Sequence, residues 1–353
     1  MRIDIVVGTR PNFVKVAPII RAIEEYKDIE YRLIHTGQHY DCFIDDVFFK
    51  ELDLPQPYIN LNVGSVSHPI AEMMCKLEDF WNIDRPEVVL VVGDVNSTVA
   101  AALVVSKLDI KLIHVEAGER SFDRTMPEEI NRIITDHISD LLFCSTSTAI
   151  DNLNNDGIPV EKRYIVGNVM VDSVLHYLSK ASKISVPLED YVFLTLHRAA
   201  NVDSYDKLKA ILEAINSISY EMKVIFSIHP RTKTQIDKFG LWKYLSNVEI
   251  KFPPLSYLNC IAYMKGAKII MTDSGGIQFE AATLKVPCIT IRDSTEHTET
   301  IINKVNILVK TEKEKIITTF RSVLKSEYIP MNTGDGKASK RIIDILKRES
   351  KKW

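Results

Sequence analysis

Short runs of Val, Ile and Leu recur along the whole chain, and segments with helical spacing lie between most of them. This alternation constrains the fold more than any other feature, because it is typical of βαβ units with parallel strands. Strands that are almost continuously apolar are expected where helices cover both faces of a sheet. The expected strands are residues 2–7, 31–34, 88–92, 111–115, 141–144, 164–166, 191–196, 223–228, 269–271, 287–291 and 307–309.

The expected strands fall into two series. The first ends near Val166, and the second begins at Tyr191 after a polar stretch that is capable of forming a helix. A chain of 353 residues is also too long for one ordinary core, which favours two domains. We therefore predict an α/β protein with two doubly wound parallel sheets. Its expected parts are an N-terminal domain over residues 1–167, a C-terminal domain over residues 168–330 and a final segment over residues 331–353.

Composition argues against several classes of protein. The formal net charge of -3 disfavours a protein that neutralises nucleic-acid phosphates in bulk. The five cysteines, at positions 42, 75, 144, 260 and 288, form no CxxC pair and fit a reducing compartment. No apolar run approaches membrane-spanning length, and the N-terminus leads directly into a strand. We expect a cytoplasmic protein with neither a nucleic-acid nor a membrane partner.

Polar or glycine-rich residues follow several of the expected strands. Ligands of doubly wound sheets bind at the carboxyl ends of the strands, so these residues are expected to line one cleft. They are Gly8 to Pro11, Gly93 and Asp94, Glu116 to Gly118, His197 and Arg198, His229 to Arg231, and Asp273 to Gly276.

The stretch from Ile269 to Leu284 reads IIMTDSGGIQFEAATL and predicts a strand, a tight turn and the start of a helix. Unpaired N–H groups at a helix start suit a phosphate, and Gly275 and Gly276 would let it approach the backbone closely. The alternative is an ordinary turn in which Ser274 caps the helix.

Two cations near the N-terminus, Arg10 and Lys15, would add positive charge at another helix start. Together with the turn after Asp273, they would suit a diphosphate. The alternatives are a solvated helix residue for Lys15 and a simple turn residue for Arg10.

Three carboxylates follow strands or begin a helix in the first half of the chain: Asp94, Glu116 and Glu128. A set of carboxylates opposite a phosphate site suggests proton abstraction and delivery. Asp94 could instead only cap a helix, and either Glu128 or its neighbour Glu129 could be a first-turn charge that stabilises the helix.

Two histidines, His197 and His229, each end a strand in the second half. For His197 a catalytic or phosphate contact and a structural role are both open. No histidine pair has metalloprotease spacing, and His35 with His39 lacks further ligands, so no metal is expected. There is no GxGxxG after the first strand and no GxxxxGK[ST], so the phosphorylated ligand is expected to be neither NAD nor hydrolysed ATP, and no cofactor is expected.

Seven ordered motifs cover nearly the whole chain. They are GTRPNFVKVAP, GQH at residues 37–39, VVGDVNST, HVEAGERSFDRTMPEEINR, TLHRAANVD, IHP and TDSGGIQFEA. In this order they resemble the non-hydrolysing UDP-N-acetylglucosamine 2-epimerases. The resemblance implies a glycosyltransferase-B type of fold, in which two Rossmann-like domains face a central cleft and a C-terminal helix crosses back onto the first domain. It also implies a homodimer.

The resemblance implies inversion of C2 in UDP-GlcNAc to give UDP-ManNAc, a precursor of surface polysaccharides. UDP is eliminated to leave a 2-acetamidoglucal and is then added back, without a cofactor. Position by position, Asp94, Glu116 and Glu128 match the family's catalytic acids, and His197 matches a histidine linked to catalysis and UDP. The substrate and UDP contacts would be Arg10, Lys15, His229, Ser274, Gly275, Gly276, Glu280 and Arg292, with Glu280 on the ribose hydroxyls.

Several positions depart from the family pattern. Glu119-Arg120 replaces Leu-Arg, and Thr295 to Glu299 reads TEHTE instead of TERPE. Asp41 stands where activator-dependent members have a glutamine, and LNVGSVSHP offers no arginine, which puts allosteric activation by UDP-GlcNAc in doubt.

The sequence leaves more than one activity open. VVGDVNST and SFDRTMPEEINR also occur in relatives that act on UDP-2,3-diacetamido-glucuronate, so that sugar is the main alternative substrate. A hydrolysing epimerase, a glycosyltransferase of the same fold and a nucleotide-sugar-binding regulatory protein stay open as well. The GTRPNF start argues against the hydrolysing enzyme, and the intact acids argue against the regulator.

Overall fold

The structure is a computed structural model that describes residues 1–37, 48–64 and 66–353. The predictions about Gln38, His39, Asp41 and Cys42 therefore concern positions outside the described residues. The chain divides into two compact units. Unit 1 comprises Met1–Ser173 and Gly334–Trp353, and unit 2 comprises Val174–Thr333.

Unit 1 contains a seven-stranded sheet with the order β3-β2-β1-β4-β5-β6-β7. All neighbouring strands are parallel. The chain moves outward in one direction from β1 and in the other from β4, so the switch point of the doubly wound sheet lies between these two strands. The strands are β1 (Arg2–Val7), β2 (Glu30–His35), β3 (Ile59–Asn60), β4 (Val88–Val92), β5 (Lys111–Val115), β6 (Leu141–Cys144) and β7 (Arg163–Ile165).

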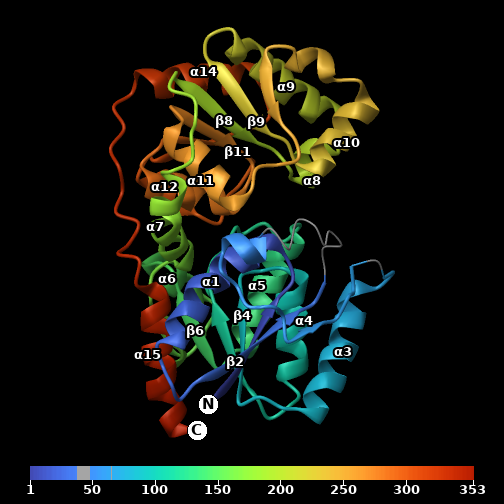
Figure 1. The fold of residues 1–353 in the computed structure, drawn as a ribbon, viewed down its shortest axis with the longest axis vertical. Helices are drawn as coiled ribbons and strands as arrows, with labels where there is room; N and C mark the ends of the chain where they lie inside the picture. The colour runs from blue at the N-terminus through green and yellow to red at the C-terminus, as the bar shows by residue number, and fades with distance from the viewer. Residues whose placement is uncertain (38–47, 65) are drawn as a thin grey trace. The chain divides into compact units, whose positions relative to one another are not determined.

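The helices of unit 1 pack in neighbouring groups around this sheet. In Figure 1, α15 lies beside α1, whereas α3 and α4 lie together on the other side of the strands. Apolar side chains of β4, α3 and α4 form one core, which includes the fully buried Trp81. The helices are α1 (Arg10–Glu24), α3 (Pro69–Ile83), α4 (Asn96–Val105), α5 (Pro127–Ile138), α6 (Ser147–Asn155) and α15 (Ala338–Glu349), and α7 (Val169–Ala181) runs from unit 1 into unit 2.

Unit 2 repeats the same pattern with a six-stranded parallel sheet in the order β10-β9-β8-β11-β12-β13. Its switch point lies between β8 and β11. The strands are β8 (Tyr191–Thr195), β9 (Lys223–Ser227), β10 (Val248–Lys251), β11 (Ile269–Thr272), β12 (Cys288–Ile291) and β13 (Asn306–Val309).

The main core of unit 2 lies between this sheet and the neighbouring helices α9 and α14. Helix α9 contributes apolar residues at helical spacing, such as Ile211 and Ile215, and α14 contributes Phe320. The helices are α8 (Ala199–Val202), α9 (Tyr205–Ser219), α10 (Pro230–Phe239), α11 (Tyr257–Gly266), α12 (Gly275–Leu284), α13 (Thr298–Ile302) and α14 (Lys313–Lys325).

The predicted fold class, two doubly wound parallel-sheet units, is confirmed. Every predicted strand is present, with ends that differ by about one residue. Two strands were missed, β3 and β10, and both lie at a sheet edge. β3 has only two residues, and β10 reads VEIK, in which polar residues interrupt the apolar run. Edge strands need not be apolar on both faces, so their sequences do not stand out.

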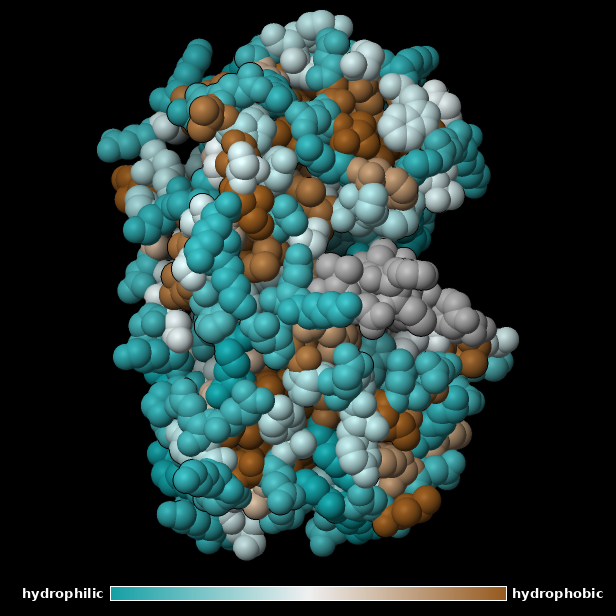
Figure 2. Space-filling view, in the orientation of Figure 1, coloured by the Kyte–Doolittle hydropathy of each residue, from teal (hydrophilic) through white to brown (hydrophobic). Residues whose placement is uncertain are grey.

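The described part of the chain contains no helix with both the length and the apolar character needed to cross a membrane. On the face drawn in Figure 2, hydrophobic residues are interspersed with hydrophilic ones. Around α15, at the lower left, the drawn surface is hydrophilic. The apolar side chains of this helix, such as Ile342 and Leu346, are fully buried.

Helix α15 is held against the rest of unit 1 by polar contacts at its start and along its length. The carboxylate of Asp172 accepts hydrogen bonds from the backbone N–H groups of Ala338 (3.1 Å) and Ser339 (2.7 Å). Farther along, Asp344 bonds the hydroxyl of Tyr26 on the loop after α1. Because the first N–H groups of a helix have no partners within it, Asp172 caps α15 from a distant part of the sequence.

We predict that Asp172→Ala lowers the stability of the α15 attachment by about 1 to 2 kcal/mol, the usual cost of losing a helix cap. Hydrogen exchange at the amides of α15 should quicken accordingly, whereas exchange in unit 2 should not change. Glu25→Ala is the matched control, because among the described residues the carboxylate of Glu25 forms only an exposed ion pair, with Lys340 of α15. Equal exchange rates in the two variants would contradict the capping role.

Candidate functional site

The turn after β1 is fixed by Asn12, a residue that the sequence reasoning missed. Its side-chain oxygen accepts hydrogen bonds from the backbone N–H groups of Gly8 and Thr9, both at 3.2 Å. Its side-chain amide donates to the carbonyl of Val92 at 3.1 Å, which joins this turn to the end of β4. Asn12 is the third residue of α1 and forms a capping box with Thr9, so the TRPN pattern was the available signal. Arg10 is the first residue of α1.

Lys15 is not a solvated helix residue. Its ammonium group forms an ion pair with the carboxylate of Glu116, and the two side chains are only 15% and 11% exposed. A Cβ atom at Gly93 would lie 3.0 Å from the Lys15 nitrogen, so a glycine there leaves room for the pair. Burial alone would lower the pKa of Lys15, but Glu116 and Asp94 outweigh it and the pKa is raised. Lys15 therefore stays charged beside both carboxylates.

Glu116 stands in a strained part of the backbone, directly after β5. Its φ angle is +66°, a region that side-chain-bearing residues rarely adopt. Gly118, two residues on, has a φ of +80°, and a Cβ atom there would collide with the carbonyl oxygen of Ala149. Such strain persists only where surrounding contacts fix it, and it is common at functional sites.

Asp94 and Glu128 differ in how they are held. Asp94 does not cap α4, because the N-cap residue is Val95. Its carboxylate pairs with Arg132 of α5, and its carbonyl accepts a hydrogen bond from Asn131 at 2.8 Å. Glu128 is the second residue of α5, and its carboxylate makes no hydrogen bond or ion pair with the described part of the chain.

Glu129, its neighbour, is buried and has a structural role. It accepts hydrogen bonds from the N–H groups of Ser121 and Phe122, both at 2.9 Å, and pairs with Arg132 at 2.8 Å. Of the two adjacent acids, Glu128 is therefore the one whose carboxylate is available. In unit 1, Lys15, Glu116 and Asp94 come together, while Glu128 lies on the helix that contacts Asp94.

In unit 2, the carboxylate of Asp273 holds the turn that carries His197. Asp273 is fully buried and accepts hydrogen bonds from the N–H groups of His197 (2.9 Å) and Arg198 (3.0 Å). The ring of His197 is partly exposed and lies 5.7 Å from that of His229. His229 also has a structural role, since its Nδ1 accepts a hydrogen bond from the N–H of Arg231.

Partial burial lowers the pKa of His197, and the positive charges of Arg198, Arg292 and Arg231 lower it further, against the opposing effect of Asp273. The imidazole is therefore neutral at neutral pH. The arginines have carboxylate partners as well: Arg231 pairs with Asp203, and Arg292 pairs with Glu296 at 2.8 Å.

The start of α12 has no side-chain cap, and a glycine follows its N-cap residue. Ser274 occupies the N-cap position, but its side chain makes no capping hydrogen bond. A Cβ atom at Gly275 would collide with the carboxylate of Glu296, so only glycine admits this close approach. Arg292 is buried and donates to Glu296 at 2.8 Å, while its Nη1 has no hydrogen-bond partner among the described residues. These groups place a carboxylate and a guanidinium beside the first turn of the helix.

Farther along α12, Glu280 is buried close to the hydroxyl of Tyr257. Burial and the charge of Glu280 raise the pKa of Tyr257, which keeps the phenol protonated. Both residues belong to unit 2.

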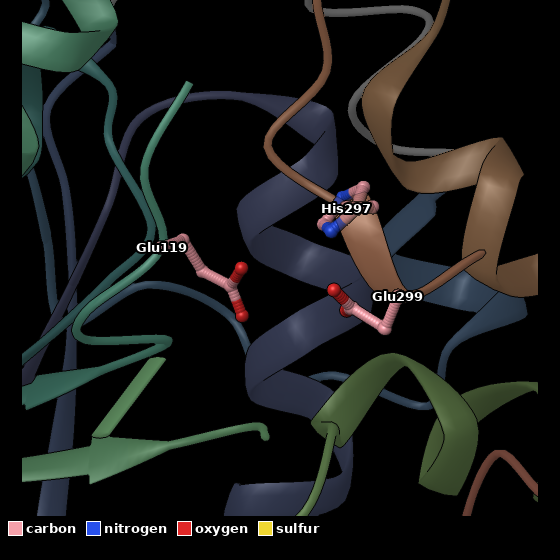
Figure 3. A group of neighbouring side chains, drawn as sticks. All are labelled: Glu119, His297 and Glu299. Atoms are coloured by element: carbon pink, nitrogen blue, oxygen red, sulfur yellow. The ribbon is translucent and has the colours of Figure 1, made fainter. Parts of the chain in front are cut away.

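The loop after Arg292 departs from the family pattern. Figure 3 shows His297 and Glu299 at the start of α13. The ring of His297 packs edge-on against Phe279 of α12 at 4.9 Å, so this histidine has an apolar neighbour. Burial raises the pKa of Glu299, and the nearby Glu296 raises it further. Figure 3 also shows Glu119, which lies in unit 1 in the loop that follows β5 and is buried there.

The residues predicted as a site thus form one group in each unit. The group of unit 1 contains Lys15, Asp94 and Glu116, with Arg10 at the start of α1 and Glu128 at the start of α5. The group of unit 2 contains His197, His229, Ser274, Gly275, Gly276, Glu280 and Arg292. That both groups line one cleft stays a prediction.

Comparison with known proteins identifies the family. The sequence profile described as UDP-N-acetylglucosamine 2-epimerase matches residues 21–347. The chain belongs to the UDP-N-acetylglucosamine 2-epimerase family. It is 47% identical over 362 residues to the UDP-N-acetylglucosamine 2-epimerase of Methanocaldococcus jannaschii, with 98% of this chain and 99% of that protein covered.

Two further relatives of this epimerase are informative. The UDP-2,3-diacetamido-2,3-dideoxy-D-glucuronate 2-epimerase of Pseudomonas aeruginosa is 39% identical, with 98% of this chain and 99% of that protein covered. The crystal structure of the M. jannaschii UDP-GlcNAc 2-epimerase in complex with UDP-GlcNAc and UDP has a TM-score of 0.94 and 46% identity, with 99% and 100% of the two chains covered. The glycosyltransferase-B type of fold is also seen in the spinosyn rhamnosyltransferase SpnG, with a TM-score of 0.53 and 12% identity.

We predict that Lys15→Met and Glu116→Gln each destabilise the epimerase by about 1 to 3 kcal/mol, because each leaves one partly buried charge without its partner. The double variant should lose less than the sum of the two single losses, since the second change removes that uncompensated charge. Urea unfolding, followed by a probe in unit 1, measures all four proteins. Additive losses would mean that the two side chains do not interact in solution.

Proposed function

We propose that this chain is a non-hydrolysing UDP-GlcNAc 2-epimerase that interconverts UDP-GlcNAc and UDP-ManNAc. The observation that carries the proposal is that the two units hold different kinds of polar side chain. Unit 1 concentrates carboxylates around a charged lysine, and unit 2 concentrates arginines and histidines near an open helix start. A nucleotide sugar needs both, because its diphosphate is an anion and its C2 must lose and regain a proton.

On this proposal, unit 2 holds UDP. The first turn of α12 offers backbone N–H groups from Gly275 and Gly276, where an anion is stabilised by the helix dipole. Arg292 already reaches this turn and would donate to a phosphate oxygen. Ser274 has a hydroxyl that is not used for capping. Glu280, with two acceptor oxygens, would hold the ribose hydroxyls.

The reaction is then an elimination followed by an addition. A carboxylate removes the proton from C2 as the bond between C1 and the UDP oxygen breaks, which leaves UDP and 2-acetamidoglucal. A carboxylic acid next returns a proton to C2 on the opposite face, and the UDP oxygen forms the new bond to C1. No electrons are gained or lost overall. We assign proton transfer to Asp94, Glu116 and Glu128, and we assign His197 to the leaving diphosphate.

A second substrate is favoured by one specific relative. The P. aeruginosa protein named as a UDP-2,3-diacetamido-2,3-dideoxy-D-glucuronate 2-epimerase is 39% identical to this chain. The same elimination and addition would serve that sugar, because its C2 bears the same acetamido group. The alternative is therefore a C2-epimerase of this uronate.

We also propose that the chain works in the cytoplasm as a homodimer. Its five cysteines lack any pairing motif, which fits a reducing compartment. Analytical ultracentrifugation would test the assembly.

We predict that the protein converts UDP-GlcNAc to UDP-ManNAc in deuterated water with deuterium entering C2, because the C2 proton exchanges with solvent through a carboxylate. Proton NMR of the C2 and anomeric signals measures both. Free UDP with free sugar would indicate the hydrolysing reaction instead, and conversion of only the diacetamido-uronate would indicate the second substrate. An epimerised product without deuterium at C2 would contradict the mechanism.

In the same assay, Glu128→Gln should lose about 100-fold or more in turnover, the usual contribution of a general acid or base. The side chain makes no hydrogen bond or ion pair with the described part of the chain, so its substitution should leave the fold intact. His137→Gln is the matched control, because His137 is exposed at the far end of the same helix.

We predict that UDP binds with uptake of a proton at His197. The free protein has a lowered pKa at this residue, so the ring is neutral above that value. Bound diphosphate would neutralise the surrounding arginines and raise the pKa toward its ordinary value of about 6.5. Affinity should therefore increase as pH falls through the range just below about 6.5, by at most about tenfold per pH unit.

Calorimetry in buffers of different ionisation enthalpy measures this proton uptake. His197→Gln should abolish the proton uptake that is due to the histidine and leave the proton uptake that is due to UDP itself. Equal proton uptake by the wild type and the variant would contradict the assignment.

A further inference from the structure

The buried face of α5 is polar, which is unusual for a helix that packs on a parallel sheet. Its buried residues are Glu129, Asn131, Arg132, Thr135 and Asp136. Helices in such folds normally turn an apolar stripe toward the core. Burying polar groups is costly unless each finds a partner, so the partners explain why this face exists.

Most of these partners lie on the two loops that carry proposed catalytic carboxylates. Asn131 and Arg132 contact Asp94 in the loop after β4. Asp136 contacts the loop after β5, where its Oδ2 accepts a hydrogen bond from the N–H of Gly118 at 3.1 Å. Gly118 lies two residues beyond Glu116. A single helix thus contacts both loops.

The carboxylate of Asp136 is the centre of this arrangement. It is fully buried and is surrounded by three donors: the Nδ1 of His114 at 2.7 Å, the Nη1 of Arg120 at 2.7 Å and the N–H of Gly118. Burial alone would raise the pKa of Asp136, but His114 and Arg120 outweigh it and the pKa is lowered. The carboxylate is therefore ionised and accepts all three hydrogen bonds.

His114 extends this contact to the loop after β4. Its Nε2 faces the carbonyl oxygen of Gly93 at 2.9 Å, one residue before Asp94. A carbonyl oxygen and an ionised carboxylate can only accept hydrogen bonds. Each ring nitrogen of His114 therefore faces an acceptor, and the ring satisfies both acceptors only when both nitrogens carry hydrogen. The buried ring bridges Asp136 to the Asp94 loop.

We propose that Asp136 and His114 are positioning residues for the epimerase reaction, and that through them α5 fixes the Asp94 loop and the Glu116 loop relative to each other. The proposal rests on the proposed function. Neither residue touches the sugar; both act through the backbone on either side of the proton-transfer groups. The strained backbone at Glu116 makes such fixing necessary, since a strained turn relaxes when its surrounding contacts are lost.

The experiment compares three variants of the full chain. Asp136→Asn removes the charge and an acceptor from both loops. His114→Asn keeps a donor near the position of Nδ1 but cannot reach Gly93, so it should release only the Asp94 loop. Thr135→Val is the matched control, because Thr135 is equally buried on the same helix and its hydroxyl has no hydrogen-bond partner among the described residues.

Hydrogen exchange tests the positioning directly and does not depend on turnover. Asp136→Asn should quicken exchange in peptides that cover residues 92–97 and 115–122, His114→Asn should quicken only the first, and Thr135→Val should change neither. Wild-type protection of both loops in Asp136→Asn would overturn the proposal. If the wild type does not turn over UDP-GlcNAc, the proposed function fails, but this result still decides whether the two residues hold the loops.

Kinetics then test whether the positioning matters for the reaction. Asp136→Asn should lower kcat about 100-fold, as expected when reacting groups are misplaced by about 1 Å, with KM and UDP affinity nearly unchanged. The number of UDP-binding sites per protein molecule, measured by titration, shows how much of each variant is folded. The double variant Asp136→Asn/Glu116→Gln should lose less in kcat than the product of the two single losses, because both changes impair Glu116. Losses that multiply, or a kcat equal to that of Thr135→Val, would refute the role.

Discussion

Charges that leave water must find partners inside the protein, and unit 1 is organised around this constraint. Lys15, Asp94, Glu116 and Arg132 all lie at or near the carboxyl ends of parallel strands, where a buried charge without a partner would be costly. Each cation faces at least one carboxylate, so the charges survive burial. The sheet places these side chains close together, and the ion pairs keep them charged and fixed. A carboxylate held in this way can accept a proton.

Unit 2 meets a different requirement with the same sheet topology. Three arginines lower the pKa of His197, and the carboxylate of Asp273, which opposes them, also holds the turn that carries this histidine. Arg292 and its partner Glu296 lie beside the first turn of α12. The carboxylates proposed for proton transfer thus belong to unit 1, and the arginines around His197 belong to unit 2. Such a contrast could not come from the fold, which is alike in both units.

The sequence predicted the parallel sheets because buried strands are continuous apolar runs, and it predicted the strand-end residues because polar groups stand out after such runs. It did not predict the pairing of Lys15 with Glu116, since no periodicity links residues so far apart in the chain. It also missed Arg132 and Asp136, because charged residues on a helix normally read as its solvated face. Asn12 and Asp273 were missed as structural residues because a side chain that bonds backbone groups leaves almost no pattern of its own.

Unit 1 is built from two separate pieces of the chain, Met1–Ser173 and Gly334–Trp353, with the whole of unit 2 between them. The second of these pieces, which carries α15, follows unit 2 in the chain and is therefore synthesised after it. Unit 2 can complete its own core before α15 is made, and the caps and apolar contacts that join α15 to unit 1 form only afterwards. A nascent chain that does not yet contain α15 would thus expose the surface of α1 that α15 covers in the folded protein.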